Sequence, residues 1–443
     1  MRRMLLIFLL VVILISSCGP GASTPLPTAA AGTLFVDPQV DLGPISPYIY
    51  GSNFGPWTAV PMGMMDYALN SHITNLRFPG GEWGDANDLQ EYQIDQFMWL
   101  LEQMGAEATI SVRLLNGTPE AAAELVRYVN LEKKYNVRYW SVGNEPTLYE
   151  GRPDVDSYDT VRFNREWRAI AEAMKAVDPE ILLLGPELHG TFTSNFDTNP
   201  KDSAGRDWMT EFLKANGDLV DVVTYHRYPF PLTTGSANAT VADLRQDTPE
   251  WTRTVRYLRQ LIQETTGRDL PIGVTEAGSH YTKAVGGEGT PDSFYNAIWW
   301  ADVLGRLITE QVLIVNQWIF TATAGQGGLG LIYVGEVRPT YYVYQMYQHF
   351  GSQLVYSTCG QEGVSVYAAK REDGSLTLLV INLLDTEQSL KLEVKGKKMN
   401  TAETWRFDAE HLAENLGEQD LSSGTLTLPA QSISLYVIEE MGE

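Results

Sequence analysis

The chain has 443 residues and a formal net charge of −23 at pH 7, from 55 Asp and Glu against 32 Lys and Arg. So acidic a chain disfavours nucleic acid and anionic lipid surfaces as general partners. Its length is enough for a large barrel and one smaller domain.

Residues 1–17 predict an export signal. Arg2 and Arg3 precede an apolar stretch, 5–15, that is too short to span a bilayer. Cys18 comes next, at the end of a string that resembles the lipobox of bacterial lipoproteins, in which this cysteine is lipidated and becomes the new N-terminus. Residues 18–33 continue with Gly, Pro, Ser, Thr and Ala and predict a flexible tether. We expect an exported lipoprotein held at the outer side of a bacterial membrane; an ordinary secretory signal is the alternative.

The chain has two cysteines, Cys18 and Cys359. If Cys18 carries lipid, no intramolecular disulfide is possible and Cys359 is a lone thiol. Since no histidine-containing motif accompanies Cys359, we expect a buried, packed side chain rather than a nucleophile.

Between residues 34 and 352, short apolar runs alternate with amphipathic stretches. The runs that predict strands lie at 48–51, 75–78, 108–114, 137–143, 181–187, 220–226, 271–274 and 313–318. The stretches that predict helices lie at 95–104, 119–135, 163–177, 207–216, 251–265, 291–308 and 341–350. Near-continuous apolar strands alternating with helices indicate a parallel sheet covered on both faces. Eight such units predict an α/β protein with a (β/α)8 barrel.

From 353 to 443 the pattern changes to short strands separated by turn residues. Strands are expected at 363–368, 376–381, 390–394 and 433–438. This pattern predicts an antiparallel β-sandwich domain, and the early strand at 33–36 is a candidate to join it.

Two carboxylates follow predicted barrel strands at their C-terminal ends. Glu145 follows the fourth strand in the string Asn144-Glu145-Pro146, and Glu276 follows the seventh. Barrel active sites lie at that end of the strands. Retaining glycoside hydrolysis needs two carboxyl groups about 5–5.5 Å apart, one protonated and one ionised. Strand position alone therefore makes Glu145 and Glu276 candidates for an acid/base and a nucleophile.

The string 140–146 resembles the acid/base motif of the glycoside hydrolases of clan A, and the likeness runs from about 34 to 443. The resemblance implies that Glu145 is the acid/base and Glu276 the nucleophile. It also implies that Asn144 donates a hydrogen bond to the sugar 2-hydroxyl. The implied activity is double-displacement cleavage of O-glycosidic bonds in plant- or matrix-type oligo- or polysaccharides, without a cofactor.

Arg77 on the second strand matches the arginine that this clan places near the nucleophile. Its guanidinium is expected to keep Glu276 ionised, whereas Glu145 must stay protonated near neutral pH. A structural ion pair is the alternative for Arg77. Strict strand alternation places Asn144 and Glu145 on opposite faces, so both reach one site only if the strand bends or ends there.

Three more side chains match clan positions. His226 and Tyr228 point to one face of the sixth strand by alternation, and the resemblance implies that they contact the nucleophile or the acid/base. Trp318 on the eighth strand matches the aromatic floor beneath the sugar. A satisfied barrel histidine is the alternative for His226, and a core side chain is the alternative for Trp318.

Other candidate sites carry weaker signals. Glu187, at the end of the fifth strand, is a rival catalytic carboxylate, and Glu82 and Asp85 are expected to line a subsite or the rim. The glycine-rich string 325–328 lacks the Lys and Ser/Thr of a phosphate loop. The six histidines show no metal spacing, so no catalytic metal is predicted.

Several families share parts of the pattern. Residues 77–81 with 143–145 resemble family 51 arabinofuranosidases, and 144–149 resemble the family 79 β-glucuronidase and heparanase group. The layout also suits families 39 and 30, while the string 275–278 departs from family 51. The sugar stays open among xylosides, arabinosides, glucosides and glucuronides.

Two accounts from other classes compete with a hydrolase. One is the solute-binding component of a sugar importer, which the strand-only tail after 353 disfavours. The other is a surface lipoprotein whose barrel binds glycan without cleaving it. The long segments 188–206 and 279–292 favour a walled pocket over an open groove.

Overall fold

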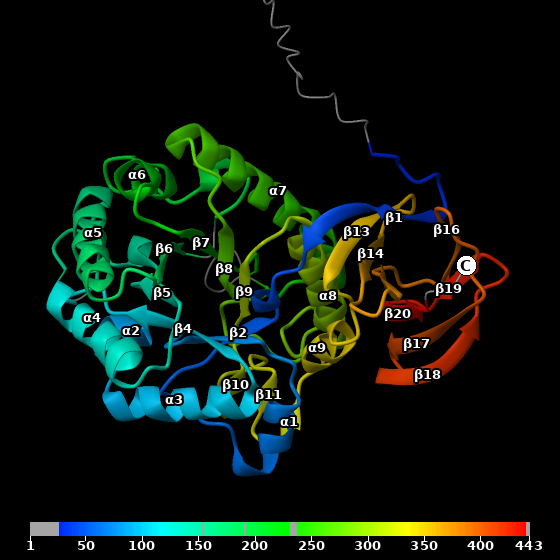
Figure 1. Cartoon of the computed structure of the whole chain (residues 1–443), viewed down its shortest axis with the longest axis horizontal. Coiled ribbons are helices and arrows are strands. Elements are labelled where there is room, and N and C mark those ends of the chain that lie inside the picture. The colour runs from blue at the N-terminus through cyan, green and yellow to red at the C-terminus, as the bar shows by residue number, and fades with distance from the viewer. Residues whose placement is uncertain (1–25, 153–154, 190–191, 231–236, 440–443) are drawn as a thin grey trace, which may run out of the picture.

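Figure 1 shows the protein as a computed structural model that describes residues 26–152, 155–189, 192–230 and 237–439. The predicted export signal and Cys18 lie outside the described residues. Within those ranges, no helix combines the length and the apolar character needed to cross a membrane.

Eight parallel strands close into a barrel in which β2 pairs with both β3 and β9. They are β2 (Gly51–Asn53), β3 (Asn75–Phe78), β4 (Glu107–Val112), β5 (Tyr139–Val142), β6 (Leu182–Leu188), β7 (Val222–Arg227), β8 (Ile272–Ala277) and β9 (Ile314–Gln317). The predicted (β/α)8 barrel is confirmed. The first strand begins later than predicted, because Ser46 caps a 3-10 turn over Pro47–Ile49, with proline at its start.

The helices surround the barrel (Figure 1). They are α1 (Met65–Leu69), α2 (Trp83–Ala86), α3 (Glu91–Met104), α4 (Pro119–Val126), α5 (Thr160–Val177), α6 (Trp208–Asn216), α7 (Val241–Thr266), α8 (Phe294–Thr309) and α9 (Tyr341–Tyr347). A π-helical turn, Arg127–Glu132, extends α4, and short 3-10 turns lie at Met62–Met64, Pro146–Leu148 and Phe196–Thr198. Helix α7 begins earlier than predicted because Thr240 and Asp243 form a capping box.

The two ends of the barrel interior differ in character. Near the strand starts, Tyr139, Leu184, Val222 and Ile314 form an apolar cluster that fills the interior. Farther along the strands the interior is polar. For example, the hydroxyls of Ser111 on β4 and Ser141 on β5 form a hydrogen bond of 2.7 Å. The apolar cluster closes one end, and the polar layer supports the charged groups at the other.

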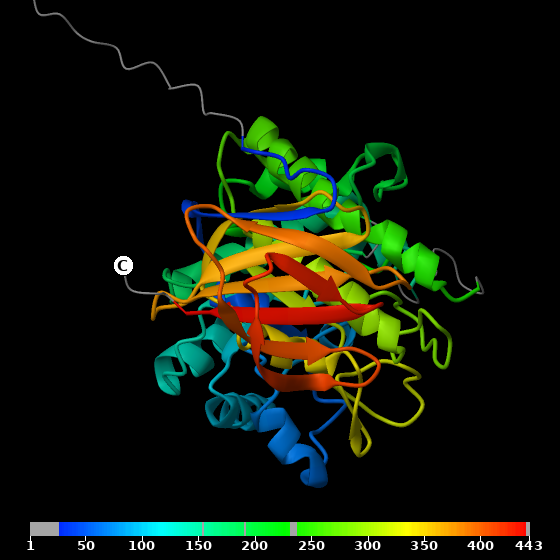
Figure 2. The ribbon, with the colours of Figure 1, turned by 90° about the vertical axis from the view of Figure 1, so that its right-hand side faces the viewer.

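The C-terminal strands and β1 (Thr33–Pro44) form one nine-stranded sheet in the order β18-β17-β20-β15-β14-β13-β1-β16-β19 (Figure 2). The other strands are β13 (Gln353–Cys359), β14 (Val364–Lys370), β15 (Leu376–Asn382), β16 (Gln388–Val394), β17 (Thr401–Phe407), β18 (Leu412–Asp420), β19 (Thr425–Leu428) and β20 (Ser432–Ile438). Side chains from distant strands, among them Val366 and Leu428, meet in one apolar cluster. The sheet therefore folds over into the two packed layers of the predicted sandwich, with one departure: β1 pairs with β16 in parallel.

The sandwich packs against the barrel through α8 and α9. The ring of Tyr367 on β14 lies so close to α8 that a Cβ at Gly305 would be 2.1 Å from it. The Tyr367 hydroxyl donates to Asp302 Oδ1 at 2.6 Å. Cys359, at the end of β13, is half-buried rather than fully buried as expected. A small three-stranded sheet, Thr321–Ala322, Ile332–Tyr333 and Glu336–Val337, lies after β9.

Candidate active site

Glu276, near the end of β8, is almost fully buried and is held by three hydrogen-bond donors. Arg77 Nη1 and the Gly81 backbone N–H both donate to Oε1 at 2.9 Å. The Tyr228 hydroxyl donates to Oε2 at 2.8 Å. Donors on both oxygens fix the direction of the carboxylate.

Glu145 leaves the strand pattern before it reaches the site. Strand β5 ends at Val142, Gly143 has φ +82°, and Glu145 itself has φ +48°. Its backbone N–H donates to the Glu187 carbonyl at 2.9 Å. The chain therefore turns after the strand, which resolves how Asn144 and Glu145 both face the cleft.

His226 lies between two carboxylates. Its Nδ1 is 2.9 Å from Glu145 Oε1, and its Nε2 is 2.9 Å from Glu187 Oε2. Burial alone would lower the pKa of His226, but the surrounding carboxylates raise it to about 9. Both ring nitrogens then carry hydrogen, and each donates to a carboxylate.

The environment of Glu145 differs from the expected one. Burial raises the pKa of Glu145, but the hydrogen bond and the charge of His226 outweigh burial and place it below its ordinary value. The sequence required a protonated Glu145 near neutral pH. In the free protein the geometry instead favours an ionised Glu145, because the imidazolium of His226 lies 2.9 Å from its Oε1.

Arg77 connects several site residues from the centre of the barrel. Besides Glu276, its guanidinium donates to Asn53 Oδ1 at 3.1 Å and to Asn144 Oδ1 at 3.0 Å. It also lies 3.4 Å from Glu187. Burial lowers the pKa of Arg77, but Glu187 and Glu276 reverse this effect and raise it.

A cleft of about 810 Å³ opens above these groups. Asn144, Glu145, Tyr228 and Glu276 form its floor, and its wall includes aromatic rings, an arginine and a histidine: Trp57, Trp83, Tyr281, Trp318, Arg152 and His189. The rings of Trp57 and Trp318 are 6.1 Å apart and tilted by 30°. Trp318 thus lies on the cleft wall, with a second tryptophan beside it.

Glu82 and Asp85, the two acidic residues expected at a subsite or the rim, lie in different environments. Glu82 lines the cleft, but Asp85 is buried and accepts a hydrogen bond from the Tyr149 hydroxyl at 2.5 Å. That hydroxyl accepts one from the Asn144 backbone N–H at 3.3 Å. Burial raises the pKa of Asp85 to about 7. Asp85 therefore supports the turn that carries Asn144, because helix α2 directs its side chain inward.

Glu187, the rival carboxylate, is fully buried and does not line the cleft. Thr275 Oγ1 donates to it at 2.5 Å, in addition to its contacts with His226 and Arg77. Burial raises the pKa of Glu187, but Arg77 and His226 bring it below its ordinary value. A substrate in the cleft cannot touch this group.

Glu145, His226 and Glu276 are the described residues whose spacing would suit a metal ion, with one atom of each within 4.8 Å of the others. A histidine that binds a metal ion must be neutral. Both nitrogens of His226 already face carboxylates, and its pKa is about 9. This donor set does not fit a cation at neutral pH.

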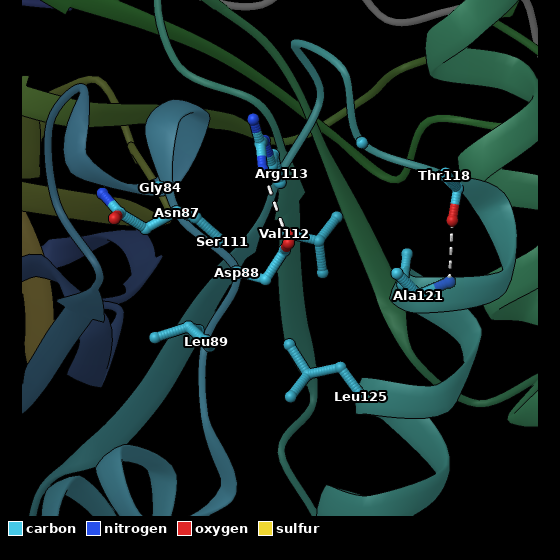
Figure 3. A pocket seen from close by; sticks show the side chains of 12 residues that line it. Gly84, Asn87, Asp88, Leu89, Ser111, Val112, Arg113, Thr118, Ala121 and Leu125 are labelled. Carbon is cyan, nitrogen blue, oxygen red and sulfur yellow. Dashed lines mark hydrogen bonds and ion pairs between the residues drawn. The ribbon is translucent and has the colours of Figure 1, made fainter.

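A separate small cavity of about 50 Å³ lies between β4 and the start of α4 (Figure 3). Arg113 reaches Asp88 there at 3.4 Å, and Thr118 caps α4 by accepting the Ala121 N–H at 3.1 Å. Arg113 Nε also donates to two backbone carbonyls. These polar groups have partners, so the large cleft is the candidate site.

The sequence had not singled out Gly81, Trp57 or His189 as site residues. Gly81 closes the second strand in a Pro-Gly-Gly string, which signals a sharp turn but not the donor to Glu276. Trp57 and His189 lie in loops, where no strand pattern points to the cleft.

Residues 361–432 match the C-terminal immunoglobulin-like domain of D-apionate lactonase. Rat (Rattus norvegicus) heparanase is 24% identical over 309 residues, which cover 65% of this chain and 52% of that protein. The chain thus spans about half the length of this curated relative.

Two solved glycoside hydrolases superpose on nearly the whole chain. CelM2, a bifunctional glucanase-xylanase from a metagenome library, has a TM-score of 0.72 at 18% identity, covering 94% of this chain and all of that one. The GH51 α-L-arabinofuranosidase of Thermotoga petrophila has a TM-score of 0.71 at 18% identity, covering 92% and 100%. The chain has the clan A fold. The expected resemblance is confirmed at the level of this fold, which enzymes of several families share.

Proposed function

We propose that this chain is a retaining glycoside hydrolase with Glu276 as nucleophile and Glu145 as acid/base. One oxygen of Glu145 lies within 4.8 Å of one oxygen of Glu276, and this observation carries the proposal. Inverting enzymes hold their carboxyl groups about 6.5–9.5 Å apart to admit a water, whereas retaining enzymes hold them about 5–5.5 Å apart.

The chemistry follows from the contacts. The Glu276 carboxylate attacks the anomeric carbon, the bond to the glycosidic oxygen breaks, and that oxygen takes the proton of Glu145. Glu145 then removes a proton from a water that attacks the same carbon and releases Glu276. A bound sugar excludes water from Glu145 and so raises its pKa from the low value of the free protein.

The cleft wall supports a carbohydrate substrate. Arg77 holds the carbonyl end of the Asn144 amide, so its NH2 group is the end presented to a sugar hydroxyl. Trp318 and Trp57 offer aromatic faces to a sugar ring. The similar proteins include a heparanase, a glucanase-xylanase and an α-L-arabinofuranosidase, and for this chain we propose a plant- or matrix-type glycan as substrate.

The location of the protein is part of the proposal. Residues 1–17 resemble an export signal and Cys18 a lipidation site. We place the enzyme outside the cytoplasm, tethered to a bacterial membrane by lipid.

The test is hydrolysis of aryl glycosides by wild type, Glu276→Gln and the matched control Glu310→Gln. The panel holds the β-xyloside, α-arabinofuranoside, β-glucoside, β-galactoside and β-glucuronide, with xyloglucan and heparan sulfate as polymers. Wild type and the control are expected to cleave at least one member and Glu276→Gln none, and proton NMR of the first product should show the anomeric configuration of the substrate.

Three results would contradict the proposal. They are full activity in a folded Glu276→Gln variant, an inverted first product, and sugar binding without turnover by wild type. The last would favour the non-catalytic surface lipoprotein.

A further inference from the structure

Glu187 is the buried carboxylate that the proposed chemistry does not use. Its side chain is fully buried and lies behind the cleft floor, where the hydroxyls of Thr224 and Thr275 donate to it at 3.2 and 2.5 Å. Its other partners are cations: Arg77 Nη2 at 3.4 Å and His226 Nε2 at 2.9 Å. Burying a carboxylate is costly unless its charge is compensated, so this position requires an explanation.

The charges around Glu145 come from several strand ends and from α2. The titratable groups that face or influence it are His226, Arg77, His189, Glu276, Asp85, Tyr228 and, through His226, Glu187. Arg77 and His226 carry two positive charges at the centre of this cluster. Glu187 and Glu276 supply two negative charges, so the four central groups balance without Glu145. Glu145 can then take up a proton without leaving a net charge in the barrel.

We propose that Glu187 is a positioning residue which, acting through His226, sets the pH range in which Glu145 can hold its catalytic proton. The inference rests on the proposed function. Without the charge of Glu187, an excess positive charge faces Glu145 and favours its ionised form. The imidazolium also loses the acceptor of its Nε2–H, so His226 gives up its proton more readily. While His226 keeps its proton, the excess positive charge beside Glu145 moves the loss of acid catalysis to lower pH; a neutral His226 would move it the other way.

The experiment compares Glu187→Gln with wild type on two glycosides of the same sugar. A phenyl glycoside needs a proton on its leaving oxygen, whereas a 2,4-dinitrophenyl glycoside departs without one. We expect the alkaline limb of kcat/KM for the phenyl glycoside to move down by about 1 pH unit or more in Glu187→Gln. At neutral pH we expect kcat/KM to fall for the phenyl glycoside but to stay near wild type for the dinitrophenyl glycoside.

Two further variants separate charge from structure. Glu187→Asp keeps the charge and should restore the alkaline limb toward the wild-type position. Glu310→Gln makes the same change at another buried glutamate, which pairs with the exposed Arg256, and should leave the profile unchanged. An unmoved limb in a folded Glu187→Gln variant, or equal losses on both substrates, overturns the inference.

A second readout does not depend on turnover. In protein labelled with ¹⁵N-histidine, the His226 signal, assigned by its loss in His226→Gln, should titrate at lower pH in Glu187→Gln than in wild type. If wild type cleaves no glycoside, the proposed function fails, and this titration alone judges whether Glu187 controls His226. An unchanged His226 titration overturns the inference in either case.

Discussion

At the scale of single residues, Gly81 is a position where the site tolerates little change. Its φ is +66°, and a Cβ there would lie 2.6 Å from Trp318 Cη2. Its N–H donates to Glu276 at 2.9 Å. One residue thus combines a left-handed backbone, a close approach to the aromatic wall and a donor to the nucleophile.

Gly81→Ala should lower both stability and activity. The left-handed conformation costs a residue with a Cβ about 1–2 kcal/mol. Displacing the turn weakens a hydrogen bond to a charged group worth about 1.5–3 kcal/mol, which corresponds to about a 10- to 100-fold loss in kcat/KM. Thermal unfolding and kinetics on the cleaved glycoside measure the two effects.

Gly105→Ala is the matched control for this prediction. Gly105 has the same φ of +66° at the end of α3, but no atom lies within 4 Å of a Cβ built there. This variant should lose stability to a similar extent and keep its kcat/KM. If both variants keep full activity, the assigned role of the Gly81 N–H is wrong.

At the scale of elements, β7 shows how one strand serves both carboxylates. His226 contacts Glu145, and Tyr228, directly after the end of β7, donates to Glu276. Tyr225 points to the opposite face of the strand, and its buried hydroxyl has no hydrogen-bond partner among the described residues. The period-two geometry of a strand sorts these side chains into a site face and a packing face.

Tyr228→Phe should reduce kcat/KM by about 10- to 100-fold, because it removes a hydrogen bond to a charged carboxylate. Tyr225→Phe, the same change on the other face of β7, should leave activity at the wild-type level and stability equal or slightly higher. Steady-state kinetics and thermal unfolding of the two variants provide the test. Equal activities in both would remove Tyr228 from the site.

At the scale of the whole molecule, the barrel and the sandwich are joined by a buried polar contact. Asp302 on α8 accepts the Tyr367 hydroxyl from β14 at 2.6 Å and pairs with Arg306 at 2.8 Å. Burial raises the pKa of Asp302, but Arg306 and its hydrogen bonds bring it below its ordinary value. The sandwich therefore contributes a donor that this buried carboxylate needs.

Tyr367→Phe should lower the free energy of unfolding by about 1–3 kcal/mol, the cost of an unsatisfied buried polar group. Tyr356→Phe, on β13, removes a hydroxyl from an exposed contact and should change it by less than about 0.5 kcal/mol. Urea unfolding followed by tryptophan fluorescence measures both values. Equal effects of the two variants would mean that the packing of the sandwich against the barrel does not depend on the Tyr367–Asp302 hydrogen bond.

The sequence by itself determined the eight-stranded barrel, the sandwich and the residues at the floor of the cleft. Apolar strand runs and the positions of Glu145 and Glu276 at strand ends are local properties, so the sequence shows them directly. Several C-terminal strands, such as Thr401–Phe407 and Leu412–Asp420, were not expected, since their apolar pattern is weak.

Only the tertiary structure decided how the charges are arranged. His226 meets Glu145 and Glu187 across three strand ends, and Gly81 meets Glu276 from a distant part of the chain. These contacts depend on barrel closure and on turns after the strands, which alternation does not encode. They lower the pKa of Glu145 in the free protein, where the sequence had required a raised one. A pKa is set by neighbours in space, and a sequence orders neighbours along the chain.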